Sequence, residues 1–184
     1  MINSYDKQVD IIPNNPGFIL SVTKKYDGKN FPFSVTCTLP ITFDFQKDTY
    51  TYLSFFIETT LENYNLQEGN WNKNNIYTSY SIILKYGCAE LNNLVTPEPL
   101  RNNGLATAIL DIVSDIIQEF NSLLERKEYE ELKGYKKIEY IYGNISSCDV
   151  GEKLNQEQLI NFYRKNGYCP ENDIKLIKYF QELS

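Results

Sequence analysis

The sequence predicts a single domain of mixed α+β, or α/β, class. Apolar and polar residues alternate in several short segments of the first half, which is typical of strands, and apolar residues of the second half recur at helical spacing. No linker rich in proline, glycine or serine separates two cores. At 184 residues with 42% hydrophobic content, the chain can bury one sizeable core. We therefore expect one domain over residues 1–184, with a strand-rich N-terminal half.

The first clear alternation lies in residues 17–26 and continues in residues 33–45. Apolar residues recur at alternate positions in both segments, with Phe18, Leu20 and Val22 in the first, so that one row of side chains can face a core while the other row faces solvent. Gly28 and Asn30 lie between the segments, and both residue types tolerate the positive φ of a tight turn. We expect two strands joined as a β-hairpin.

Residues 50–66 fit two structures. Their apolar residues recur at helical spacing, but their β-branched and aromatic content also fits a strand. We favour the helix. The asparagine-rich residues 67–75 predict a surface loop, and residues 76–84 and 88–95 predict two more strands that turn near Gly87.

From residue 88 onward the chain is expected to alternate between strand and helix. Residues 104–124 carry apolar side chains at intervals of three and four, the most regular helical pattern of the sequence. Residues 155–165 predict a second, shorter amphipathic helix. Residues 138–145 and 174–179 are rich in isoleucine and either tyrosine or lysine and predict the remaining strands.

Composition excludes several classes of chemistry. There is no histidine, which removes the usual general base near neutral pH, histidine-activated nucleophiles and most zinc sites. A formal charge of -6 disfavours nucleic acid and anionic membranes as partners. The sequence shows neither a secretory leader nor a membrane-spanning stretch. We expect a cytoplasmic, soluble protein without a metal, whose four separated cysteines stay reduced: Cys37, Cys88, Cys148 and Cys169.

A turn of small and polar residues precedes the predicted helix at residues 104–124. The first amides of a helix lack internal partners and carry the positive end of its dipole, so that they can bind an anion. Gly104 and Ala106 would let a phosphate approach the backbone, and Arg101 adds a positive charge. The alternative is an ordinary strand-to-helix turn that binds nothing, and this segment alone does not decide between the two.

Two motifs resemble those of the GCN5-related N-acetyltransferase superfamily. The first, Arg101-x-x-Gly104-x-Ala106, is similar to the family's pyrophosphate motif, Gln/Arg-x-x-Gly-x-Gly/Ala, and also lies between a strand and a long helix. The second, residues 159–168, resembles the family's aromatic-rich last helix, which ends in Tyr-x-x-x-Gly-Phe/Tyr. The resemblance covers roughly residue 88 to the C-terminus. The family's two helices between its first strands are not expected here, because residues 33–45 predict a strand.

The resemblance implies a fold and a co-substrate. The fold would be a central mixed sheet, mostly antiparallel and flanked by helices, and the co-substrate acetyl-CoA. Its pantetheine arm would lie beside residues 91–95, where that strand diverges from residues 138–145. Backbone amides near the end of this strand would polarise the thioester carbonyl, and amides of the turn would bind the diphosphate. The implied cofactor-binding residues are Leu94, Val95, Arg101, Asn102, Asn103, Gly104, Leu105 and Ala106.

Two side chains correspond to catalytic positions of the family. Glu90 would act as the base that takes a proton from the acceptor amine, and the alternative is a solvated carboxylate on a strand. Tyr163 would act as the acid that protonates the departing thiolate, and the alternative is a tyrosine that only packs in the core.

The resulting hypothesis is an acetyltransferase that moves an acetyl group from acetyl-CoA to a primary amine. The acidic composition favours a small cationic acceptor, and a protein amine is a further possibility. The alternative function is a non-catalytic acyl-CoA-binding or protein-interaction module with the same fold. Exposed edge strands and surface aromatics would be compatible with a homodimer.

Overall fold

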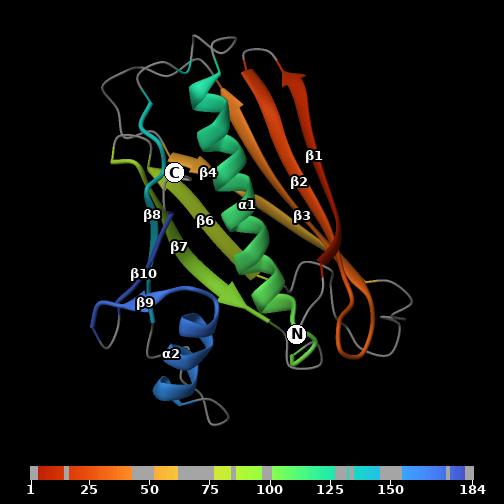
Figure 1. Ribbon diagram of the computed structural model, residues 1–184, viewed down its shortest axis with the longest axis vertical. Helices are drawn as coiled ribbons and strands as arrows, with labels where there is room; N and C mark the ends of the chain where they lie inside the picture. Colours follow the sequence, from red (N-terminus) through yellow and green to blue (C-terminus); the bar gives the residue numbers. More distant parts are fainter. Residues whose placement is uncertain are drawn as a thin grey trace.

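The computed structural model describes residues 4–14, 17–42, 52–61, 77–83, 86–96, 101–126, 132, 135–145, 155–172 and 175–180. These residues form two β-sheets and two α-helices, which confirms the mixed α+β class (Figure 1). The strands are β1 (Ser4–Asn14), β2 (Gly17–Tyr26), β3 (Phe33–Thr42), β4 (Tyr52–Ser54), β5 (Phe56–Leu61), β6 (Tyr77–Ile83), β7 (Cys88–Val95), β8 (Tyr140–Asn144), β9 (Cys169–Pro170) and β10 (Lys175–Tyr179). The helices are α1 (Leu105–Glu125) and α2 (Gln156–Lys165).

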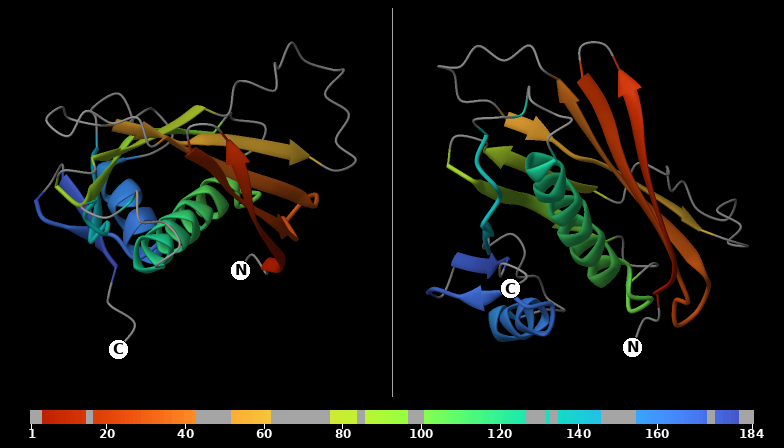
Figure 2. Two further views of the ribbon diagram at one scale, coloured as in Figure 1. Left: turned by 90° about the horizontal axis from the view of Figure 1, so that it is seen from above. Right: turned by 45° about the horizontal axis from the view of Figure 1, so that its top comes forward.

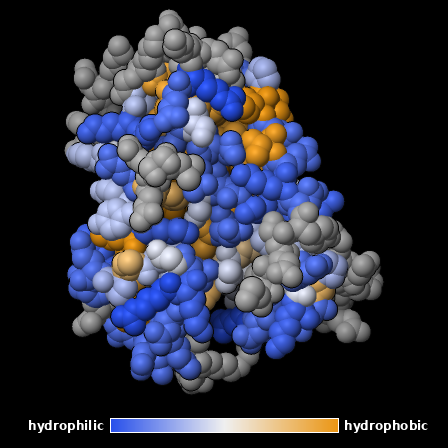
Figure 3. Space-filling model, viewed as in Figure 1, coloured by the Kyte–Doolittle hydropathy of each residue, from blue (hydrophilic) through white to orange (hydrophobic). Residues whose placement is uncertain are grey.

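The first sheet is antiparallel, with the strand order β1-β2-β3-β5. Its β2 and β3 form the hairpin expected from residues 17–26 and 33–45, with Tyr26 paired to Phe33 beside the turn. The sequence pattern does not predict β1, because most of this edge strand is exposed and a buried row of apolar residues is lacking. Ile12, near the end of this strand, is exposed. The face shown in Figure 3 is mostly hydrophilic and carries a few apolar patches.

The prediction of a helix for residues 50–66 is wrong. Strands β4 and β5 occupy the described part of this segment, and they belong to different sheets. Leu53 and Phe55 are buried while Phe56 is 61% exposed, so that burial follows the short period of extended chain. The β-branched residues near the end of β5 favour the same outcome. The loop expected at residues 67–75 lies outside the described residues.

The second sheet is mixed, with the strand order β4-β6-β7-β8-β10-β9. Only β7 and β8 run parallel among the strand pairs that the structure describes, and the other pairs are antiparallel. Parallel neighbours need a crossover connection, and α1 supplies it between β7 and β8. The strands expected within residues 76–84, 88–95, 138–145 and 174–179 are all present, and so is the helix at 104–124.

Helix α1 packs against both sheets and forms the centre of the core (Figures 1 and 2). Its buried stripe includes Ile109, Ile112, Ile116 and Phe120, each fully shielded from solvent. The shorter α2 packs partly buried side chains against the same core. At its start, Asn155 makes a capping box, which confirms the helix expected at residues 155–165. Neither helix in the described part of the chain is long and apolar enough to cross a bilayer.

Candidate functional site

The two parallel strands of the second sheet stay paired over only part of their length. Their ladder begins at Cys88 and Tyr140 and includes no described pair after Leu91 and Gly143. Strand β7 continues to Val95, paired on its other side with β6. Along that side the register shifts, so that one extra residue of β7, Asn92, lies between consecutive pairs. The bulge and the end of the ladder coincide, and we call this place the strand split.

Gly143 lies at the strand split because the strands approach closely there. A Cβ added to Gly143 would lie 3.2 Å from both the Cβ and the backbone oxygen of Leu91. A side chain at this position would therefore push against β7. The missing Cβ keeps the last pair in register before the ladder ends.

Beyond β7 the chain reaches the turn that precedes α1. Arg101 is exposed, and its Nε donates a 3.0 Å hydrogen bond to the backbone oxygen of Thr96. Asn102 and Gly104 have φ values of 62° and 93°, so that the turn contains two residues in the left-handed region. Gly104 is the N-cap of α1 and offers no side-chain cap to the first amides. Gly104 and Ala106 are partly exposed at this helix start.

Asn103, in the same turn, is buried, with 1% of its surface exposed. Its Oδ1 accepts hydrogen bonds from the amides of Asn30, at 2.6 Å, and Phe31, at 3.4 Å. Its Nδ2 donates to the backbone oxygen of Phe31 at 3.2 Å. Neighbouring Leu105 is equally buried. Asn103 therefore connects the turn to the β2–β3 loop, a contact between distant segments that no local pattern could indicate.

Glu90 lies one residue before the last parallel pair. Since Ala89 and Leu91 on either side belong to the core, the Glu90 side chain lies on the opposite face of the sheet. Its partner across the ladder is Tyr142. Burial, the charge of Glu90 and a hydrogen bond to it raise the pKa of Tyr142 to about 12.

Tyr163 lies on the other side of the sheet, within a group of tyrosines in the core. Its ring is 5.7 Å from that of Tyr168, centroid to centroid, in an edge-to-face arrangement. The hydroxyls of Tyr80 and Tyr168 are buried and make no hydrogen bond of good geometry with any described residue. Burial raises the pKa of Tyr80 well above its usual value, and Tyr168 and Tyr163 raise it further. Three phenols thus gather on the core side, whereas Glu90 lies on the opposite face.

Sequence reasoning did not single out Tyr80, whereas Tyr168 is the last residue of the second motif. Tyr80 is paired with Leu91 across β6 and β7, directly beside the strand split. With 15 tyrosines in the chain, only the pairing of distant strands distinguishes Tyr80 from the rest.

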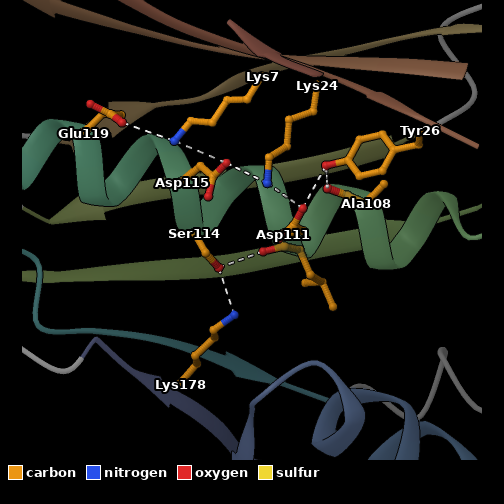
Figure 4. A network of polar contacts seen from close by, with 10 residues as sticks. Lys7, Lys24, Tyr26, Ala108, Asp111, Ser114, Asp115, Glu119 and Lys178 are labelled. Carbon is orange, nitrogen blue, oxygen red and sulfur yellow. Dashed lines mark hydrogen bonds and ion pairs between the residues drawn. The ribbon is translucent and has the colours of Figure 1, made fainter. Parts of the chain in front are cut away.

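A second polar cluster joins α1 to the first sheet (Figure 4). Lys24 Nζ lies 2.8 Å from Asp111 Oδ2 and 2.7 Å from Asp115 Oδ2, and Tyr26 donates a 3.0 Å hydrogen bond to Asp111. Lys7 Nζ reaches Glu119 at 3.2 Å. Burial lowers the pKa of Lys24, but hydrogen bonds to the two aspartates outweigh this effect, and the pKa is raised. These pairs hold α1 in place, which fixes the position of the turn at its start.

The two buried cysteines offer no activated nucleophile. Burial raises the pKa of the Cys37 and Cys88 thiols, and Cys169 is exposed and free. Cys148 lies outside the described residues. Among the residues that were placed, no three acidic or cysteine side chains cluster as a metal site would require.

Comparison of this chain with models of protein families, with curated proteins and with solved structures finds no match. The resemblance of its two motifs to an acetyltransferase family is therefore a hypothesis. The geometry of the site is therefore the basis for assigning a function to this chain.

Proposed function

We propose that this chain is an N-acetyltransferase that uses acetyl-CoA as donor and a primary amine as acceptor. The observation that carries the proposal is the strand split. The parallel ladder ends after Leu91 and Gly143, and β7 then leads toward a glycine turn at the start of α1. A thioester with an extended pantetheine arm matches this shape, because the arm can bond to strand backbone while the diphosphate reaches the helix start.

The turn supports the diphosphate part of the proposal. Arg101 and Asn102 are exposed, and Gly104 and Ala106 are partly exposed. We assign the anion contacts to these four residues, with Gly104 and Ala106 binding through their backbone amides. We assign Asn103 and Leu105 to shaping the turn, because both are buried. This assignment removes Asn103 and Leu105 from the anion contacts expected from the sequence.

The reaction transfers an acetyl group without a metal. Glu90, directly or through a water molecule, accepts a proton from the acceptor ammonium, and the neutral nitrogen attacks the thioester carbon. Backbone amides near Leu94 and Val95 stabilise the oxyanion that forms. The C–N bond forms, the C–S bond breaks, and the thiolate of CoA takes a proton from Tyr163. The cationic nitrogen then loses its second proton to water, and Tyr163 and Glu90 regain their starting protonation states by exchange with solvent, with one net proton released. The products are an amide and free CoA.

The positions of the two proposed catalytic side chains are compatible with these roles. Glu90 lies on the face opposite the core, beside the strand split, while Tyr163 packs on the core side with Tyr168. A base on the acceptor side and an acid on the donor side would face the thioester from opposite directions. This separation is what direct transfer requires.

The experiment that tests the proposal is thermal unfolding with and without acetyl-CoA and CoA. A ligand that binds only the folded chain raises its melting temperature, so we expect stabilisation by both compounds at millimolar concentration. No shift would overturn the proposal.

A second measurement separates the enzyme from a non-catalytic acyl-CoA-binding module. The stabilised protein is incubated with acetyl-CoA and a panel of polyamines, aryl-alkyl amines and lysine peptides, and release of the CoA thiol is followed. Amine-dependent release supports the enzyme. Stabilisation without release above the buffer rate supports the module.

A further inference from the structure

We propose that the acceptor is an organic ammonium compound, bound by an acidic and aromatic surface on the sheet face opposite the core. We call it the tyrosine face and define it as Glu90, Tyr140, Tyr142 and Tyr179. The inference rests on the proposed function and adds to it the residues that recognise the acceptor.

The four side chains are neighbours across three strands. Glu90 of β7 is paired with Tyr142 of β8, and Tyr140 of β8 is paired with Tyr179 of β10. The ring centroids of Tyr140 and Tyr142 are 6.3 Å apart, and those of Tyr140 and Tyr179 are 6.0 Å apart. The ring planes of these two pairs are tilted relative to each other by 46° and 50°. They form a continuous aromatic surface that ends at a carboxylate.

This surface is accessible to a ligand. Tyr179 is 64% exposed, and Glu90, Tyr140 and Tyr142 are each partly exposed. Within the described residues, Glu90 makes no ion pair. The neighbouring Lys175 Nζ lies 2.6 Å from Glu171 Oε2, and its charge is already balanced there.

The charge of the surface selects a cation. The faces of tyrosine rings carry partial negative charge and attract ammonium groups within about 6 Å of the ring centroid. The Glu90 carboxylate adds a full negative charge beside Tyr142, and the whole chain carries a formal charge of -6. An ammonium group with a hydrocarbon body would satisfy both parts of the surface, whereas an anion would be repelled.

The position of the surface agrees with an acceptor site. Glu90 and Tyr142 form the last pair but one before the ladder of β7 and β8 ends. An ammonium group held there lies next to the strand split, on the side away from the proposed acid Tyr163. The same carboxylate would then both attract the amine and remove its proton.

The test is binding of 2-phenylethylammonium to the protein in the absence of acetyl-CoA, followed by saturation-transfer difference NMR. The matched control is 2-phenylethanol, which has the same hydrocarbon body without the charge. We expect saturable binding of the ammonium compound and binding of the alcohol that is weaker by roughly tenfold or more.

Variants locate the binding to the tyrosine face. Glu90→Gln should weaken ammonium binding roughly tenfold, and Tyr142→Leu roughly two- to fivefold, while Tyr142→Phe should retain the affinity because the ring remains. Phe56→Leu removes an exposed aromatic from the other sheet and should have no effect. Circular dichroism on each variant verifies that it is folded.

The outcomes separate this inference from the proposed function. No saturable binding, equal binding of the alcohol, or unchanged affinity in both folded Glu90→Gln and Tyr142→Leu variants would overturn the tyrosine face as the acceptor site. If acetyl-CoA still stabilises the protein, the proposed function survives that result. If acetyl-CoA gives no shift while the ammonium binds as expected, the function fails and the cation-binding surface remains.

Discussion

The backbone amide of Asn30 donates a 2.6 Å hydrogen bond to Oδ1 of Asn103, which joins the β2–β3 loop to the turn before α1. The backbone amide of Phe31 donates to Asn103 Oδ1, and the backbone oxygen of Phe31 accepts from Asn103 Nδ2. Gly28 lets Asn103 enter, since a Cβ at that glycine would clash with its side-chain amide. The geometry of the proposed anion-binding turn thus depends on a loop of the first sheet.

Substitution Asn103→Ala should destabilise the protein and impair the turn. It removes the acceptor for two backbone amides in a largely buried place, and an unsatisfied buried group costs about 1–3 kcal/mol. Urea unfolding of the variant measures this cost, and acetyl-CoA should stabilise the variant less than the wild type. Asn102→Gly is the control, because Asn102 is exposed and glycine accepts its φ of 62°. Equal unfolding free energies for the two variants would contradict a structural role for Asn103.

Substitution Lys24→Met should also destabilise the protein. The Lys24 side chain is 10% exposed and that of Asp115 is 16% exposed, so that removing the lysine leaves a largely buried carboxylate with only the longer contact to Lys7 Nζ, at 3.6 Å. Loss of one partner of such a pair costs about 3 kcal/mol. A double-mutant cycle with Asp115→Asn measures the coupling. If the cost of Lys24→Met is the same with and without Asp115, the ion pair does not stabilise the fold.

Stability should fall at alkaline pH through the same cluster. The pKa of Lys24 is raised above 10.5, and that of Tyr26 is raised above 10.0, chiefly by burial and then by Asp111. A raised pKa means that the folded state holds its proton longer than the unfolded chain. The contribution is therefore complete below pH 10 and is lost as pH rises through the folded pKa. We expect Tyr26→Phe to reduce the alkaline slope of the unfolding free energy by up to about 1.4 kcal/mol per pH unit. Identical slopes for the two proteins would show that Tyr26 does not contribute.

Local patterns predicted the elements whose burial follows a single period. The rows of buried residues in β2 and β3 and the buried stripe of α1 are visible in the sequence because one face of each is apolar. The prediction for residues 50–66 was wrong because the apolar residues of two short strands in different sheets together have the spacing of a helix. Strand β1 was missed because an exposed edge strand needs no apolar row.

The candidate site likewise has a part that local sequence patterns could predict and a part that they could not. The turn at Gly104 could be recognised, because a small residue before a helix is a local signal. The contact between Asn103 and Phe31 and the position of Tyr80 beside Leu91 depend on the pairing of distant segments. No single sequence without known contacts contains that information.

Substitution Gly143→Ala should disturb the strand split. The added Cβ would lie 3.2 Å from the Cβ and backbone oxygen of Leu91, so that β7 or β8 must shift, at a cost of about 1–2 kcal/mol. Amide hydrogen exchange should then be faster in β8, where the ladder to β7 would be weakened. Adding Leu91→Ala removes only the contact with Leu91 Cδ2, at 3.5 Å, because alanine keeps the Cβ and the backbone oxygen, so that most of the crowding should remain. An unchanged free energy of unfolding and unchanged amide exchange in Gly143→Ala would mean that the strands can accommodate a Cβ at this pair.

Substitution Tyr163→Phe should slow acetyl transfer and leave acetyl-CoA binding intact. The phenol ring keeps its edge-to-face contacts with Phe162 and Tyr168, and only the hydroxyl that would protonate the thiolate is lost. Loss of a general acid lowers the rate by roughly 10²–10⁴-fold, whereas stabilisation by acetyl-CoA should match the wild type. Tyr168→Phe is the control, because it removes a neighbouring buried hydroxyl that makes no good hydrogen bond among the described residues. This variant should change the free energy of unfolding more than the rate of acetyl transfer. Equal rate losses in both variants would assign Tyr163 to packing, and a wild-type rate in Tyr163→Phe would exclude it as the acid.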